Sequence, residues 1–398
     1  MKSLLSIILL MFALACHASN DNWTGTWATA IEPVGKKDMP KCGILASRSV
    51  RQIIKVSAGG KEIRLKLSNR FSGAPLEIKS VFIADAADSS SIRPRTARWL
   101  TFGKKKNVVV KAGEGVASDP LRYDLRPLQR LAITINYGNA PEAQTGHRGS
   151  RNTSYIIKDK GKPSTSYAKG ERIERWFNID ALEVKGSAKR GIAILGNSIT
   201  DGYGSSVNKN DRWADIMAEK LEGNDLTDST GVMNLGIGGN CVLRGGLGPT
   251  ALKRFDYDIL GQSGVTDLII FEAINDIGWI DKNAQQCADE LIEAYKQFID
   301  KAHAKGMKVY GATITPFGKS FYYKGFFREA ARQTVNEWIR TSGAFDGVID
   351  FDRAMRDPEA PNCMKEAYQK DWLHPNPDGY KAMGEFAAEY FIEQAKAK

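Results

Sequence analysis

Residues 192–202 read Ile-Ala-Ile-Leu-Gly-Asn-Ser-Ile-Thr-Asp-Gly, and this stretch decides the fold of the second half of the chain. Its first four residues are apolar and fit a short buried strand, and the glycine, asparagine and serine that follow are typical of a tight turn. The pattern predicts that Ser198 lies just after the end of a strand, where a serine nucleophile is commonly exposed. It also raises the question of whether Ser198 is an active nucleophile, because Asn197 stands where a related motif has aspartate.

Further along, short apolar segments alternate with helical patterns. The strand candidates are residues 192–195, 232–235, 267–271, 308–312 and 348–351. Apolar residues recur at helical spacing over residues 287–302 and 327–339, and a last helical stretch covers about 379–395. This alternation predicts a parallel sheet covered on both faces. Ligands bind beyond the carboxyl ends of such strands, where the loops after Leu195, Leu235, Phe271 and Thr313 fall.

The first half has a period of two instead. Residues 61–68 and 131–137 alternate apolar and polar side chains, and further strand candidates are 52–56, 76–83 and 107–111. Gly, Pro, Asn and Ser turns separate them. We therefore predict an antiparallel β-sandwich over residues 22–184, a polar connector, and an α/β domain over residues 190–398. A chain of 398 residues is long enough for two such domains.

The amino-terminal residues 1–18 have the pattern of a secretory signal: one lysine, an apolar stretch too short to span a bilayer, and small residues suited to cleavage. Cleavage after Ala15 or Ala18 removes it. If the cut falls at the first of these bonds, directly before Cys16, the alternative is that Cys16 becomes a lipid-anchored cysteine. No later segment is long and apolar enough to cross a membrane. The sequence thus predicts a protein that is secreted, periplasmic or at the cell surface.

Charge and cysteine content limit the function classes. The net charge of +10 comes from lysines and arginines dispersed along the chain, whereas a nucleic-acid site needs a concentrated basic stripe. Beyond Cys16, the cysteines are Cys42, Cys241, Cys287 and Cys363, and none has the spacing of a metal site. We interpret them as free buried cysteines and expect no nucleic-acid partner.

A serine nucleophile needs a base, usually a histidine oriented by a carboxylate. His374 fits, because it follows the last predicted strand in Asp-Trp-Leu-His-Pro-Asn-Pro-Asp-Gly (371–379), where two prolines fix the backbone. Asp371 can fold back onto its ring, although an aspartate there could also be a simple turn former. His17 lies in or beside the signal. His303 ends a predicted helix, and we interpret His147 as a polar loop residue.

Acyl transfer also needs donors for an oxyanion. Asn-Leu-Gly-Ile-Gly-Gly-Asn (234–240) follows the second strand, and its glycines let backbone N–H groups approach a ligand closely. Ala-Ile-Asn-Asp (273–276) follows the third strand and supplies the side-chain amide of Asn275. Each loop alone could be only a tight turn. Together with Ser198 and His374 they converge on one edge of the predicted sheet.

These four segments resemble, in order, the blocks of the SGNH (GDSL-type) hydrolase superfamily over about residues 190–398. The resemblance implies a flavodoxin-like three-layer α/β/α domain that needs no metal or cofactor. It implies that Ser198 is the nucleophile, His374 the base and Asp371 its partner. The N–H groups of Ser198 and Gly239 and the Asn275 amide would hold the oxyanion.

Two positions depart from the family pattern: Asn197 stands for aspartate and Ala273 for glycine. The triad acid of this family is the residue three before the histidine, so Asn197 lies outside the proton-transfer chain. We expect Ala273 to affect only a tight backbone approach. The first half of the chain also resembles the jelly-roll-like β-sandwich found ahead of the catalytic domain in secreted SGNH esterases that act on carbohydrate.

Aromatic side chains near the predicted site suggest the substrate, because their faces suit sugar rings. The candidates for substrate binding are Trp279, Phe317, Phe321, Tyr322 and Tyr323. The sequence therefore predicts a secreted serine esterase that removes acetyl groups from a plant polysaccharide or oligosaccharide. A lipid or aryl-ester hydrolase of the same fold is one alternative. A non-catalytic carbohydrate-binding protein, whose α/β half has decayed, is the other.

Overall fold

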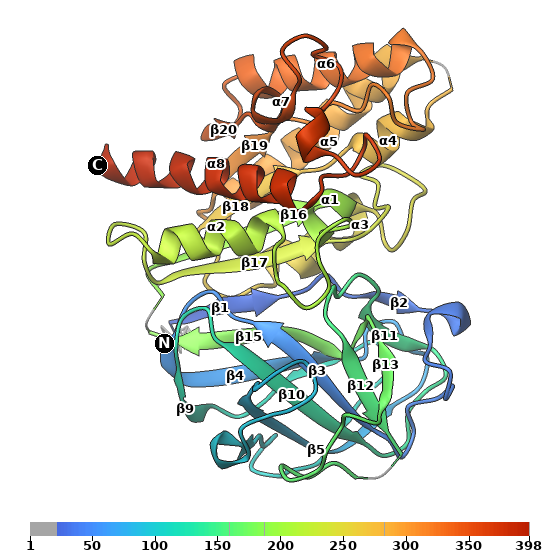
Figure 1. The fold of residues 1–398 in the computed structure, drawn as a ribbon, viewed down its shortest axis with the longest axis vertical. Coiled ribbons are helices and arrows are strands. Elements are labelled where there is room, and N and C mark those ends of the chain that lie inside the picture. Colours follow the sequence, from blue (N-terminus) through green and yellow to red (C-terminus); the bar gives the residue numbers. More distant parts are fainter. Residues whose placement is uncertain (1–21, 159, 187, 282, 398) are drawn as a thin grey trace, which may run out of the picture.

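The computed structural model describes residues 22–158, 160–186, 188–281 and 283–397. Antiparallel sheets fill the first half of the chain and a parallel sheet with helices fills the second, and the two halves stack along the long axis of the molecule (Figure 1). The predicted signal segment and the alternative anchor at Cys16 lie outside the described residues. Within the described ranges, no helix has the length and apolar character needed to cross a membrane.

The first half is a β-sandwich built from three antiparallel sheets. Its five-stranded sheet contains β1 (Trp23–Ala28), β15 (Ile179–Lys185), β4 (Gly60–Ser68), β8 (Gly115–Ala117) and β9 (Leu121–Leu125). Its seven-stranded sheet contains β13 (Glu171–Ile173), β12 (Ser154–Ile157), β3 (Ser49–Lys55), β10 (Arg130–Tyr137), β5 (Leu76–Asp85), β6 (Arg98–Trp99) and β7 (Val108–Val110). The small third sheet contains β14 (Trp176–Phe177), β11 (Gln144–His147) and β2 (Glu32–Val34).

The alternation seen in the sequence builds the core of this sandwich. Ile63, Leu65 and Leu67 on β4 are fully buried, as are Ile133 and Ile135 on β10, and all five belong to one apolar cluster between the sheets. Charged neighbours on β4 alternate with these side chains and lie outside that cluster. The period-two pattern therefore identifies the buried face of these strands correctly.

The second half is a three-layer α/β/α domain. Its parallel sheet has the order β17 (Thr230–Gly236), β16 (Arg190–Gly196), β18 (Asp267–Phe271), β19 (Lys308–Ala312) and β20 (Gly347–Ile349). The helices are α1 (Ser198–Asp201), α2 (Trp213–Glu222), α3 (Ala251–Phe255), α4 (Ile274–Trp279), α5 (Ala284–His303), α6 (Phe326–Thr341), α7 (Phe351–Met355) and α8 (Pro377–Lys396). Single turns form η1 (Lys36–Asp38), η2 (Pro94–Thr96), η3 (Asp256–Leu260) and η4 (Glu366–Tyr368).

The strand order is 2-1-3-4-5, as in flavodoxin-like folds. Helices α2 and α8 pack together on one face of the sheet, and α5 and α6 pack together on the other (Figure 1). The chain reverses its direction of winding between β16 and β18, so the loops after these two strands flank the point where doubly wound sheets bind ligands. Ser198 and Asn275 lie just after those two strands.

Two sequence predictions need correction here. Residues 348–351 were expected to be strand, but β20 ends at Ile349 and Phe351 begins α7, because the Asp350 side chain caps that helix by accepting the N–H of Arg353. The four described cysteines are free, as expected, yet Cys42 is only partly buried.

The strands predicted at 267–271 and 308–312 have the bounds of β18 and β19.

Candidate active site

Ser198 stands on the turn between β16 and α1, and local hydrogen bonds fix this turn. Asn197 is the residue before the helix, and its Oδ1 accepts the N–H of Ile199 at 3.1 Å. Gly202 ends α1 in the left-handed region, with a φ of +95°. The Ser198 side chain is buried apart from a small exposed fraction. Asparagine thus caps this helix through the same oxygen that an aspartate would use.

His374 reaches the serine from the loop between η4 and α8. Its Nε2 lies 2.9 Å from Ser198 Oγ, and its Nδ1 lies 2.9 Å from Asp371 Oδ2. Asp371 also accepts the backbone N–H groups of Leu373 and His374. Burial raises the pKa of Asp371, but the hydrogen bonds from His374 outweigh it and bring that pKa to about 2. Asp371 is therefore a carboxylate at neutral pH, and the predicted Ser-His-Asp chain is assembled in space.

The two loops expected to supply oxyanion donors meet at the same place. Gly239 has a φ of +70°, in the left-handed region that favours glycine. The Asn275 amide is held at both ends, because its Nδ2 donates to Asn240 O at 2.7 Å and its Oδ1 accepts the Tyr322 hydroxyl at 2.8 Å. The carboxylate of the next residue, Asp276, accepts two backbone N–H groups of the glycine-containing loop and so ties that loop to α4.

Ala273 precedes Asn275 in a strained conformation. Its φ is +93°, in the region that a non-glycine residue rarely adopts. The alanine methyl group therefore costs backbone strain rather than displacing Asn275, whose hydrogen bonds are intact. The expectation concerned a tight backbone approach, whereas the effect found at Ala273 is its positive φ.

A cavity of about 420 Å³ joins these groups. It is lined by Ser198, Gly239, Asn275 and His374, together with Phe321 and Tyr322. A second cavity of about 240 Å³ adjoins it, because Asn275 lines both. Trp279 lines this second cavity and is 65% exposed. Pockets of several hundred Å³ with a few convergent polar groups are typical of small-molecule sites.

The remaining aromatic candidates do not reach the cavity. Phe317 is completely buried in the apolar core of the α/β domain, so its assignment to substrate binding is wrong. Tyr323 packs edge-on against Phe317, with the ring centroids 6.4 Å apart, and lines neither cavity. The sequence could not separate these rings from Phe321, because all of them stand in one loop without a periodic pattern.

The family comparison agrees with this geometry. The model of the GDSL-like Lipase/Acylhydrolase family matches residues 194–382, which include Ser198, Gly239, Asn275, Asp371 and His374. This part of the chain is a GDSL-like acylhydrolase domain. The family hydrolyses acyl esters, so ester hydrolysis is the general activity of the GDSL domain. No curated protein matches the chain.

Several solved structures align with about half of the chain. A GDSL-like lipase from Bacteroides thetaiotaomicron is 20% identical, with a TM-score of 0.39 over 52% of this chain and 89% of that one. A member of the lipolytic protein G-D-S-L family from Veillonella parvula is 19% identical, with a TM-score of 0.37 over 51% and 98%. An acetyl xylan esterase is 18% identical, with a TM-score of 0.38 over 50% and 98%.

The sequence prediction missed the contribution of the β-sandwich to the cavity of the GDSL domain. Arg148, Gly149 and Arg151, which follow β11, line the cavity together with Ser198. His147 is not the polar loop residue that we expected, because it is 2% exposed and its Nε2 lies 2.9 Å from Asp201 Oδ1. The sequence signal is the basic cluster in Gly-His-Arg-Gly-Ser-Arg (146–151), but nothing local shows which carboxylate it meets.

The other expectation about histidine concerns His303. Its Nε2 lies 2.8 Å from Asp346 Oδ2 at the end of α5, and it lines neither cavity. His303 therefore contacts a carboxylate at the surface and has no place in the site.

Proposed function

We propose that this protein is a serine ester hydrolase that removes O-acyl groups, above all O-acetyl groups, from plant polysaccharides or oligosaccharides. The observation that carries the proposal is the hydrogen-bonded chain from Ser198 Oγ through His374 to Asp371, with 2.9 Å at each link. Nucleophile, base and orienting acid at these distances are what acyl transfer requires.

In the proposed first step, Ser198 Oγ forms a bond to the ester carbonyl carbon while its proton passes to His374 Nε2. The carbonyl oxygen becomes an oxyanion, held by the N–H groups of Ser198 and Gly239 and by the Asn275 amide. The bond to the leaving alcohol then breaks, and His374 returns the proton to that alcohol. Water repeats the sequence in the second step, releases the acid and restores Ser198. Every proton is carried by these residues, so the scheme needs no metal or cofactor.

The lining of the cavity supports a carbohydrate ester rather than a long acyl chain. Its aromatic faces come from Tyr203, Phe321 and Tyr322, and its charged groups include Glu32, Arg148 and Arg151. The aliphatic side chains in the lining are Leu247 and Leu373. A lipase would need a continuous aliphatic groove, whereas aromatic faces mixed with polar groups suit sugar rings.

Substitution of the nucleophile tests the proposal. The Ser198→Ala chain should lose hydrolysis of 4-nitrophenyl acetate by about 10³-fold or more, because residual catalysis then comes from the oxyanion donors alone. Ser206→Ala is the matched control, since Ser206 lies outside the cavity, and it should keep the wild-type rate. A fluorophosphonate should label the wild-type chain and not Ser198→Ala. Full activity in Ser198→Ala would overturn the proposal.

A panel of substrates tests the proposed specificity. Acetate release from acetylated xylan, pectin and their oligosaccharides should exceed the hydrolysis of long-chain aryl esters at equal concentration. Dominant long-chain activity would favour the lipid or aryl-ester hydrolase instead. Failure of both labelling and hydrolysis would favour a carbohydrate-binding protein without catalysis.

A further inference from the structure

The wall of the cavity that the β-sandwich supplies carries more charge than the catalytic groups require. Three carboxylates line the cavity: Glu32, Asp38 and Asp201. Two arginines line it with them, Arg148 and Arg151, and both stand on the segment between β11 and β12. What this wall can bind depends on which of these charges are already paired.

Each of the three carboxylates already has a close cationic partner. Glu32 accepts hydrogen bonds from the backbone N–H and the guanidinium of Arg148. Asp38 Oδ1 lies 2.8 Å from Arg175 Nη2. Asp201 Oδ1 lies 2.9 Å from His147 Nε2.

His147 counts as a cation in this balance. Its Nδ1 faces Ala30 O at 2.9 Å and its Nε2 faces Asp201, so both ring nitrogens face acceptors and both donate. Burial lowers the pKa of His147, but Asp201 raises it further, and the net shift is upward. The pKa of Asp201 is raised by burial and lowered by His147, with a net downward shift. The two groups are therefore an ion pair.

Arg151 is left over from these pairings. Its nearest carboxylate oxygen is Asp201 Oδ2 at 3.8 Å, which is beyond hydrogen-bond distance. Within the described part of the chain, no acceptor reaches its buried Nε. Its φ is +50°, and its carbonyl oxygen accepts the N–H of Asn208 at 2.8 Å. A strained backbone that holds an incompletely bonded guanidinium against a cavity is a feature of ligand sites.

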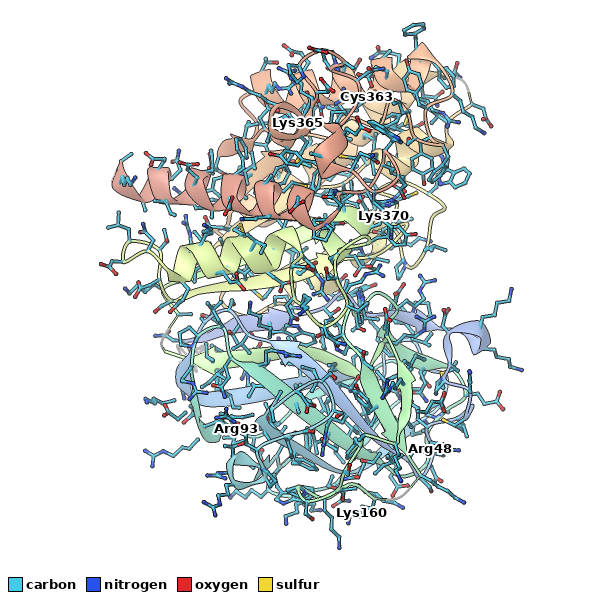
Figure 2. The ribbon with its side chains drawn as sticks, in the orientation of Figure 1. Arg48, Arg93, Lys160, Cys363, Lys365 and Lys370 are labelled. Atoms are coloured by element: carbon cyan, nitrogen blue, oxygen red, sulfur yellow. The ribbon has the colours of Figure 1, made fainter. Side chains whose placement is uncertain are left out.

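A second cation, Lys370, lies with Arg151 near the aromatic ring of Tyr203. Tyr203 lines the cavity and packs on His374, with the ring centroids 4.5 Å apart. The Arg151 guanidinium lies 5.4 Å from the centre of the Tyr203 ring, and Lys370 Nζ lies 4.4 Å from it. Figure 2 shows Lys370 on the part of the α/β half that lies near the β-sandwich, whereas Lys365 is farther away. Among the described residues, neither cation has a carboxylate within hydrogen-bond distance.

We propose that Arg151 and Lys370 form a carboxylate-binding subsite beside the triad, so that the preferred substrate is an acylated sugar acid, a hexuronate. Two cations beside one aromatic ring, neither with a carboxylate at hydrogen-bond distance among the described residues, match a sugar ring with a carboxylate on its edge. A guanidinium binds a carboxylate through paired hydrogen bonds, and an ammonium adds charge. The inference rests on the proposed esterase function and names its substrate class.

The test compares two substrates that differ in one charge: an O-acetylated hexuronic acid methyl glycoside and the methyl ester of the same molecule. For the wild-type full chain, kcat/KM should be at least about tenfold higher on the free acid, which is the gain expected of one charge-assisted contact. Added salt should reduce this ratio. Arg151→Gln and Lys370→Gln should each bring the ratio towards unity, and Arg151→Lys should restore part of it.

The ratio is independent of the fraction of enzyme that is folded, and Lys370→Gln changes an exposed side chain, so the test does not depend on the stability of Arg151→Gln. Arg93→Gln and Lys160→Gln are matched controls, because both residues are exposed and lie on the sandwich far from the α/β half (Figure 2). These controls should keep the wild-type ratio.

Two outcomes separate the subsite from the function. A wild-type ratio near one, or a ratio that neither substitution changes, overturns the subsite while hydrolysis of 4-nitrophenyl acetate leaves the esterase in place. If no substrate is hydrolysed, the proposed function fails. In that case, calorimetry on the Ser198→Ala chain measures the binding of both molecules and tests the subsite separately. The subsite requires about tenfold tighter binding of the free acid than of its methyl ester, and equal binding overturns it.

Discussion

The side chain of Asn197 connects the nucleophile turn to a buried acid. Its Oδ1 caps α1, and its Nδ2 donates to Glu272 Oε2 at 3.3 Å. Burial raises the pKa of Glu272 to about 8, although Arg254 nearby lowers it. Glu272 therefore holds a proton at neutral pH, and the amide of Asn197 adds no charge beside it. Asparagine at this position suits the buried acid and stays outside the triad.

This contact predicts how the Asn197→Asp substitution changes stability with pH. The raised pKa of Glu272 means that its share of folding stability is present below its ordinary pKa of 4.5 and is lost as the pH rises through about 8. At about pH 5.5 the protonated Glu272 can donate to the introduced carboxylate, so Tm should stay near the wild-type value. At about pH 9 two carboxylates face each other, and the cost should be about 2–3 kcal/mol.

Thermal unfolding of both proteins at the two pH values checks this. An equal loss of Tm at both would show that Glu272 does not face residue 197. Among the described residues, the hydrogen bonds of the Asn197 side chain go to Ile199 and Glu272 and not to Ser198 Oγ or His374, so kcat/KM should change by less than about tenfold in active enzyme. An increase of several orders of magnitude would place Asn197 in the chemistry after all.

At the scale of elements, β11 positions the cavity wall by means of one buried ion pair. His147 ends β11, and Asp201 ends α1, the helix that begins with Ser198. Both side chains are 3% exposed. The pair therefore fixes the segment that carries Arg148 and Arg151 against the turn that carries the nucleophile.

Removing one partner should cost more than removing both. His147→Gln leaves Asp201 without its close cation and should lower stability by about 3 kcal/mol at about pH 6, whereas His147→Gln with Asp201→Asn should cost less. Because the pKa of His147 is raised, the stabilisation is complete below its ordinary pKa of 6.5 and is lost as the pH rises through the folded value. Tm measured at about pH 6 and about pH 9 should show a smaller gap between wild type and His147→Gln at the higher pH. A double variant less stable than the single one would contradict the pairing.

Some elements and contacts of this chain have local sequence signals, and others do not. The bounds of β18 and β19 were predictable because apolar runs between turn residues are local signals. The triad histidine and its aspartate were predictable as a pair because they stand three residues apart. His147 and Asp201 are 54 residues apart and belong to different halves of the chain, so no local pattern joins them. Phe317 and Phe321 look alike in sequence, and only packing decides that one is core and the other lines the cavity.

At the scale of the whole molecule, the β-sandwich covers the edge of the parallel sheet. β17 is an edge strand of that sheet, and the Val232 N–H donates to Ser57 Oγ at 2.8 Å across the contact between the two halves. Thr29, after β1, forms a parallel bridge with β17. Gly25 on β1 lies so close to β17 that a Cβ there would clash with Met233 Sδ. The sandwich therefore protects an apolar edge strand and also completes the cavity wall.

Separation of the halves should therefore cost both solubility and activity. A fragment of residues 190–398 exposes Met233 and the edge of β17, and exposed apolar edge strands promote aggregation. In the fragment, Met233→Lys should raise the soluble yield, because a lysine on an edge strand opposes strand pairing. In the full chain the same substitution should lower Tm, because Met233 is fully buried there. Size-exclusion chromatography and Tm measure the two effects. The soluble fragment should also lose the preference for the free hexuronic acid, since it lacks Arg151. A monodisperse unmodified fragment that keeps the wild-type preference would show that the GDSL domain works alone.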